Sequence, residues 1–176
     1  MKQLIVGIAL IIVLIFMLVF QIDNYNCRLQ SDFLKYCADE ASNSASLLYD
    51  EDEYKLGSKI FIEEEGIKSI ENTIKHYLKT DDNLVPLSDS YLKDKISYTA
   101  YFFDDDLECR IYKNGTYINS FNFSYPYLYT DKELNYKKSV GTANVIVTIN
   151  AGKSTYSLIF LNDPIITRSS GYEYEI

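Results

Sequence analysis

The chain has 176 residues, of which 47% are hydrophobic and 15% aromatic, and its formal net charge at pH 7 is −8. This apolar content is far above that of a disordered tail and is enough to form one hydrophobic core. The negative charge disfavours binding to nucleic acid and to anionic lipid through a basic patch, so we expect neither as a partner.

Residues 4–20 form an apolar run without a polar side chain. A helix of this length rises about 1.5 Å per residue and is just long enough to cross a hydrocarbon core. A cleaved signal peptide is the alternative, but no pair of small residues follows Phe20 at the spacing of a cleavage site. We therefore expect a retained anchor that contacts membrane lipid through residues 4–20.

The orientation of this anchor follows from its flanking charges. Lys2 precedes the apolar run and Asp23 is the first charge after it. The positive-inside rule then places the N-terminus in the cytoplasm and the following domain outside the cell membrane, as a single-pass protein.

No glycine or proline occurs between Gly7 and Gly57, so the sequence contains no signal that ends the helix at the membrane. We expect one helix over residues 3–49, formed by a transmembrane anchor at 1–22 and an extension at 23–49, with an ectodomain over 50–176. Apolar residues of the extension recur every three or four positions, which predicts one apolar stripe along a continuing helix. Its members are Ile22, Tyr25, Leu29, Phe33, Cys37, Ala41, Ala45 and Leu48.

The stripe changes from bulky to small side chains at Cys37, Ala41 and Ala45, which follow one another at a spacing of one turn. Small residues allow another helix or a sheet to approach closely. That neighbour is either the core of the same chain or another subunit, and the sequence leaves both open.

The segment over residues 34–45, directly after a single membrane helix, resembles the signature of the TadE/TadG-like pilus-assembly (pseudopilin-like) proteins of bacteria. Lys35 stands where that signature has glutamine, and Cys37 and Glu40 stand where it has alanine. The resemblance implies a small accessory or minor component of a pilus-like assembly or secretion machine. The candidate helix-packing or partner-contact residues are then Leu34, Cys37, Ala38, Asp39, Ala41 and Ala45.

The chain departs from this family at two points. Prepilin processing needs a glutamate five residues after the cleavage glycine, but Ile12 follows Gly7 at that distance. The Asp-x-Ser-x-Ser motif of the larger members' metal-binding adhesion domain does not occur. We expect neither pilin-type cleavage nor that metal site.

A second helix is predicted from Glu63 to Lys79, because three glutamates suit a helix N-terminus and four apolar residues follow on one face. That face consists of Ile67, Ile70, Ile74 and Leu78. His76 lies off it and is interpreted as a solvated surface residue.

From residue 96 onward the apolar period is two, which is typical of strands. Strands are predicted at 96–103, 108–112 and 117–121, with Asn114 and Gly115 as a hairpin turn. Further predictions are an edge strand or loop at 125–127, a strand around 145–149 that pairs with one at 156–161, and a last strand at 165–168. The predicted fold is α+β, with a long helix, one packed helix and an antiparallel sheet of five or six strands, a pilin-like shape.

Catalytic, cofactor and metal sites are not indicated. The chain has one histidine, seven glycines and no Gly-x-Ser-x-Gly. Asp104, Asp106 and Glu108 alternate like calcium ligands, but the twelve-residue loop pattern is missing and a solvated turn is the simpler interpretation. Cys27 and Cys37 lie about 15 Å apart along one helix and cannot bridge, which leaves three thiols or a bond from either to Cys109.

The sequence therefore predicts a non-catalytic, membrane-anchored structural or accessory subunit of a bacterial pilus-like or secretion assembly. The alternative is an anchored extracellular binding or sensing ectodomain, which the aromatic strands and the segment over residues 125–129 would also suit.

Overall fold

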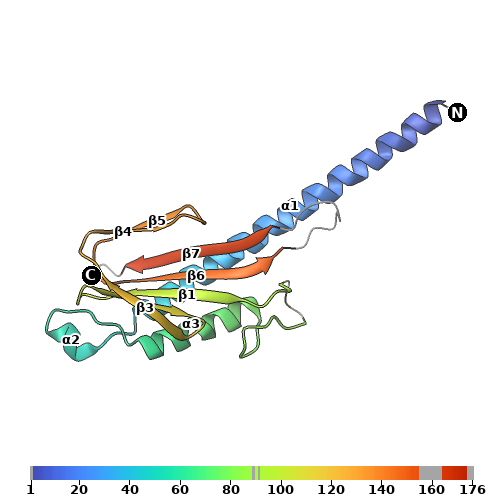
Figure 1. Ribbon diagram of the computed structural model, residues 1–176. Coiled ribbons are helices and arrows are strands. Elements are labelled where there is room, and N and C mark those ends of the chain that lie inside the picture. Colours follow the sequence, from blue (N-terminus) through green and yellow to red (C-terminus); the bar gives the residue numbers. More distant parts are fainter. Residues whose placement is uncertain (1, 89, 91, 155–163, 174–176) are drawn as a thin grey trace.

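The long N-terminal helix extends well beyond the rest of the protein (Figure 1). The computed structural model describes residues 2–88, 90, 92–154 and 164–173. Helix α1 (Lys2–Ser46) has 45 residues, and the second half of it packs with the later elements into a head. Its first half is exposed and is long and apolar enough to cross a membrane. The prediction of one uninterrupted helix is confirmed.

Two further helices follow. Helix α2 (Glu51–Lys55) is a single turn capped by Asp50, whose carboxylate accepts the backbone N–H groups of Asp52 and Glu53. This turn was not predicted from the sequence. Helix α3 (Glu63–Leu78) has the predicted bounds to within one residue and begins with the three glutamates that suit its dipole.

The head contains seven described strands, which form two antiparallel sheets. The larger sheet has the order β3-β2-β1-β6-β7, and β4 pairs only with β5. The strands are β1 (Ser97–Phe103), β2 (Glu108–Lys113), β3 (Thr116–Asn122), β4 (Tyr127–Asp131), β5 (Tyr136–Val140), β6 (Asn144–Lys153) and β7 (Ile165–Glu173). The α+β class and a five-stranded antiparallel sheet are confirmed.

The predicted hairpins had different outcomes. Asn114 and Gly115 have φ angles of 48° and 76° and join β2 to β3 as the sequence indicated. The segment after Tyr125 is the first strand of the β4–β5 hairpin, which was missed because the two lysines of β5 are poor strand signals. The predicted strand at 156–161 lies outside the described residues, and β6 pairs with β7.

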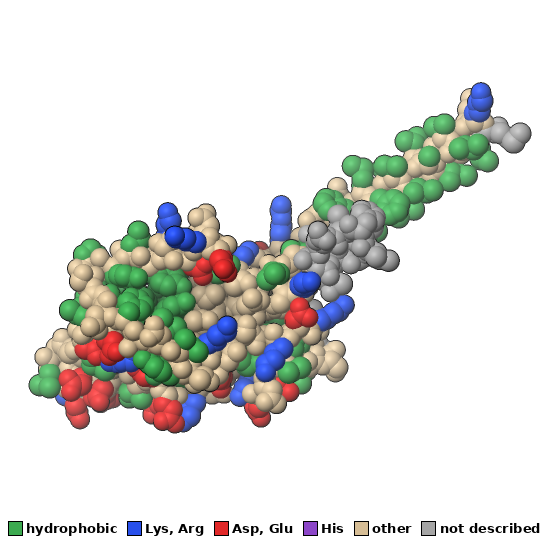
Figure 2. Space-filling model, in the orientation of Figure 1, with side chains coloured by type: hydrophobic (Ala, Val, Ile, Leu, Met, Phe, Trp, Pro, Cys, Tyr) green, Lys and Arg blue, Asp and Glu red, His purple; other side chains and the backbone are tan. Residues whose placement is uncertain are grey.

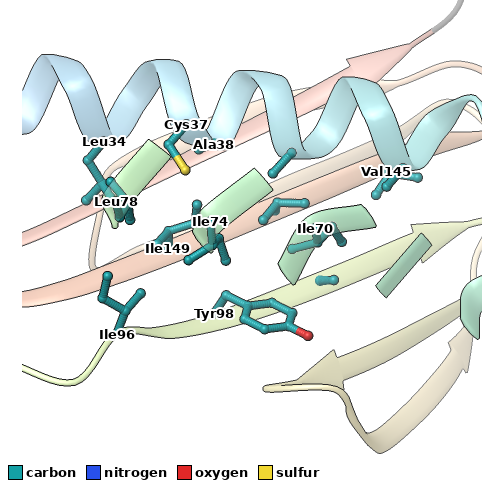
Figure 3. Packing of buried hydrophobic residues seen from close by; sticks show 14 of the residues in the cluster. Leu34, Cys37, Ala38, Ile70, Ile74, Leu78, Ile96, Tyr98, Val145 and Ile149 are labelled. Carbon is teal, nitrogen blue, oxygen red and sulfur yellow. The ribbon is translucent and has the colours of Figure 1, made fainter. Parts of the chain in front are cut away.

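The main core lies between the helices and one face of the sheet. Helices α1 and α3 lie side by side there, with Leu34 and Cys37 of α1 close to Leu78 and Ile74 of α3 (Figure 3). Beneath them, β1 and β6 contribute the buried residues Tyr98, Val145 and Ile149, and Ile96 is buried directly before β1. A second core on the opposite face contains Phe103, Cys109, Tyr129, Val140 and Ile146, and the β4–β5 hairpin contributes to it.

The predicted single stripe along α1 is wrong in its N-terminal half. Cys37, Ala41 and Ala45 are fully buried, but Tyr25 and Leu29 are 67% and 56% exposed. Each step of four residues rotates about 40° around a helix with 3.6 residues per turn. Five such steps separate Tyr25 from Ala45, so these two members of the predicted stripe lie on nearly opposite faces of the helix.

Ala41 provides a test of this close approach, because its side chain is fully buried between α1 and its neighbours. We expect Ala41→Leu to overpack the core and lower the free energy of unfolding by about 1 to 3 kcal/mol. Urea denaturation of the full chain in detergent measures this. Glu40→Leu, on the exposed side of the same turn, is the matched control and should change stability by less than about 0.5 kcal/mol. Equal effects of both substitutions would contradict this arrangement.

Candidate functional site

Five of the six predicted contact residues lie in the core of their own chain. Leu34 is 1% exposed, and the other four, Cys37, Ala38, Ala41 and Ala45, are 0% exposed. The four small side chains among them bring α1 close to α3, β6 and β7, which are its neighbours in the head. In the folded chain these five residues therefore serve internal packing, and a surface for another subunit has to be formed elsewhere.

The sixth residue, Asp39, joins α1 to the edge strand β7. Its carboxylate accepts hydrogen bonds from the Lys35 ammonium and from the Ser170 hydroxyl. Lys35 also donates to the carbonyl oxygen of Ser169 at 3.4 Å. Asp39 thus connects helix and sheet through local polar contacts, and its side chain is 46% exposed.

An exposed apolar strip runs along the opposite face of α1. We name Ile22, Tyr25, Leu29, Phe33 and Tyr36 the α1 seam. Its members recur at intervals of three and four residues, and three of them, Ile22, Leu29 and Tyr36, are seven residues apart. Four of the five side chains are more than half exposed. The seven-residue spacing is a signal that could have separated this seam from the buried face by sequence alone.

A groove between α1 and α3 lies beside this seam. The ring centroids of Phe33 and Tyr77, which is on α3, are 6.0 Å apart, and those of His76 and Tyr77 are 5.7 Å apart. The groove has a volume of about 520 Å³, and Glu40 and Thr73 also line it. His76 is exposed there, as predicted. The seam and this groove form one surface along α1.

The far end of the head from the N-terminus is acidic (Figure 2). We name residues 50–65 and 104–110 the acidic tip. These two segments contain eleven acidic and three basic residues, so their net charge of −8 equals that of the whole chain. The rest of the protein is electrically balanced.

Arg110 holds the acidic tip together. Its guanidinium lies 2.8 Å from Glu63 and 2.6 Å from Asp104 through Nη1, contacts Asp106 through Nη2, and lies 3.2 Å from Glu108 through Nε. One cation thus faces four carboxylates from α3, β2 and the β1–β2 turn. The alternating acidic residues that resembled calcium ligands in the sequence instead surround an arginine, a role that the sequence did not indicate.

Asp104 is the buried member of this cluster. Its side chain is 0% exposed, and Oδ1 accepts the Phe61 N–H at 2.8 Å. Burial raises the pKa of Asp104 from 3.8 to about 7, while the Phe61 N–H and Arg110 lower it and Asp106 and Glu63 raise it. Through its hydrogen bond with the Phe61 N–H, the Asp104 carboxylate links the segment before α3 to the end of β1.

The three cysteines are free thiols. Cys37 and Cys109 are buried, and burial raises the pKa of Cys37 to about 12 and also raises that of Cys109. Both thiols are therefore protonated and weakly nucleophilic at neutral pH. Within the described residues, no group of three or more His, Cys, Asp or Glu side chains is arranged to hold a metal ion.

Comparison of the chain with protein-family models, with curated proteins and with solved structures found no match in any of the three.

Replacing Arg110 tests the cohesion of the acidic tip. We expect Arg110→Met to lower the free energy of unfolding by about 3 to 5 kcal/mol, because Asp104 would remain buried without its cation. Lys68→Met removes an exposed pair with Glu64 and should cost less than about 1 kcal/mol. Urea denaturation compares the two variants, and a loss for Arg110→Met as small as that for Lys68→Met would contradict the proposed role.

The raised pKa of Asp104 predicts a pH dependence of stability. The folded protein binds this proton more tightly than the unfolded chain, so its stabilising contribution is complete below about pH 4 and is lost as the pH rises through about 7. The free energy of unfolding of the wild type should therefore fall relative to that of Asp104→Asn by up to about 1.4 kcal/mol per pH unit in this window. Denaturation of both proteins at a series of pH values measures the difference between their free energies of unfolding. A difference that is constant across this window would contradict the prediction.

Proposed function

We propose that this chain is a non-catalytic, membrane-anchored structural or accessory subunit of a bacterial pilus-like or secretion assembly. The observation that carries this proposal is the α1 seam, an exposed apolar strip that continues from the apolar N-terminal half of the same helix. A neighbour that also rises from the membrane could contact both parts of α1 along one line.

The geometry of the seam suits another helix. Residues spaced alternately by three and four positions form the line along which two helices pack in coiled coils. This alternation holds from the apolar run into the seam for Ile15, Leu18, Ile22, Tyr25 and Leu29. Phe33 then follows Leu29 after four residues instead of three. Burying one large apolar side chain contributes about 1.5 to 3 kcal/mol, so covering several seam residues provides a substantial driving force outside the bilayer.

The resemblance of residues 34–45 to the TadE/TadG-like signature supports the same proposal. A long helix leading from an anchor into an α+β head is also the shape of pilin-like subunits. In the proposed orientation the N-terminus is cytoplasmic and the head lies outside the cell membrane. The acidic tip then lies at the end farthest from the anionic lipid surface, where like-charge repulsion is weakest.

A second candidate function is an anchored binding or sensing ectodomain. The observation that favours it is a run of 17 residues, 114–130, which carries no charge and contains six aromatic side chains. A space-filling view shows apolar side chains gathered at the end of the head where β3 and β4 lie (Figure 2). Of the six aromatic side chains, Tyr117 is exposed, four are half-buried and Tyr129 is buried. Aromatic surface that is partly exposed often marks a binding site.

Crosslinking from the seam tests the assembly proposal. A photoreactive amino acid placed at Leu29 should crosslink to another membrane-anchored chain in native membranes, because this side chain faces outward on the seam. The same probe at Leu56, which is 81% exposed at the acidic tip, is the matched control and should give no such product. Products with lipid alone at Leu29 would contradict the proposal.

A charged substitution on the α1 seam tests whether the seam is needed to hold the partner. We expect Leu29→Glu to abolish co-purification of the crosslinked chain while changing the free energy of unfolding by less than about 0.5 kcal/mol, because the residue lies outside the core. Leu56→Glu should leave both quantities unchanged. Pull-down from detergent extracts and urea denaturation measure the two effects, and retention of the partner by Leu29→Glu would exclude the seam as the contact.

A further inference from the structure

The two edges of the large sheet differ in how their backbone groups are satisfied. At the β7 edge, Lys35 donates to the Ser169 carbonyl, and the Tyr136 hydroxyl bonds the backbone of Gly171. At the opposite edge, β3 pairs with β2 alone. Among the described residues, no backbone hydrogen bond reaches the outer side of β3. This edge is therefore open.

The register shows which groups of β3 face outward. The Phe123 N–H donates to the Leu107 carbonyl at 3.0 Å, and Phe121 pairs with Cys109. Because residues that exchange hydrogen bonds alternate along an antiparallel ladder, the backbone groups of Phe121 and Phe123 face β2. Those of Ser120 and Asn122 consequently face away from the sheet, with their N–H and C=O groups available to another strand.

The composition of β3 lacks several of the usual protections of an exposed edge. Its seven residues include no lysine, no proline and no other charge, and Tyr117 and Ile118 are 52% and 57% exposed. Natural edge strands are commonly shielded by charges, by proline or by bulges. The one irregularity is a register shift between Ile111 and Tyr112, opposite the first half of β3, so the second half keeps regular pairing.

We propose that the outer edge of β3 binds an extended segment of another protein, which adds as an antiparallel strand. The charges around the edge specify this segment. Asn122 pairs with Glu108 at the acidic tip, whereas the Thr116 end pairs with Lys113. The N-terminal end of an antiparallel strand would lie beside Asn122, so the partner is uncharged along the strand and carries Lys or Arg immediately before it.

Two synthetic peptides test this specification on the full chain in detergent. The first is acetyl-Lys-Lys-Thr-Val-Ser-Val-Thr-Val-amide, and the second has the same residues with the two lysines moved to the C-terminal end. Fluorescence anisotropy of labelled peptides should show about tenfold tighter binding of the first at low salt, because only its lysines reach the acidic tip. Equal affinities would overturn the proposed direction and register.

Substitutions at Ser120 separate backbone pairing from other contacts. Ser120→Pro removes the outward N–H without removing a donor to β2, and we expect it to weaken binding of the first peptide about tenfold. Ser120→Ala removes only the hydroxyl, which bonds Glu108, and should keep the affinity within about twofold. Unchanged binding by Ser120→Pro would overturn the proposal.

Amide hydrogen exchange on the wild type gives a readout that does not depend on a variant folding. The first peptide should slow exchange at Ser120 and Asn122 and leave the amides of β4 unaffected; protection confined to other strands would overturn the proposal. If the peptides do not bind and Ser120→Pro instead disperses a dimer of the full chain, the occupant is a second copy and the proposed partner is wrong. Leu29→Glu should not alter peptide binding, so a failure of the assembly proposal remains distinguishable.

Discussion

The close contact of α1 with its own head is the constraint on which the rest of the structure depends. Cys37, Ala41 and Ala45 are small enough to bring the helix axis near α3 and the sheet, and all three are fully buried. The same helix also contains the apolar N-terminal run, so a single element joins that run to the core. The head covers one side of α1, and the α1 seam on the other side remains exposed.

The acidic tip shows how a fold can tolerate a concentrated charge. Arg110 is one-fifth exposed and faces four carboxylates, of which only Asp104 is fully buried. Burial favours the protonated form of that carboxyl group, whereas the arginine and the Phe61 N–H favour the charged form. The other carboxylates remain in contact with solvent, where screening limits their repulsion. The tip is consequently both cohesive and strongly negative, and it lies at the opposite end of the molecule from the apolar helix.

The protein offers two kinds of exposed surface that soluble domains usually avoid. The α1 seam is apolar and helical, and it suits a neighbour that packs through side chains. The β3 edge is uncharged and extended, and it suits a neighbour that pairs through its backbone. At the β7 edge, the side chains of Lys35 and Tyr136 bond backbone groups of Ser169 and Gly171, so the two edges of this sheet differ.

The sequence by itself determined the features that depend on neighbouring residues. The continuity of α1 beyond the apolar run follows from the absence of glycine and proline there, the start of α3 from its three glutamates, and the β2–β3 turn from Asn114 and Gly115. Tertiary structure decided which face of α1 is buried. Residues four positions apart turn gradually around the helix, and the sequence alone does not show at which residue the head starts to cover it. It also decided that Arg110 gathers carboxylates from three segments and that β5 pairs with β4, since both depend on contacts between residues that are brought together only by folding.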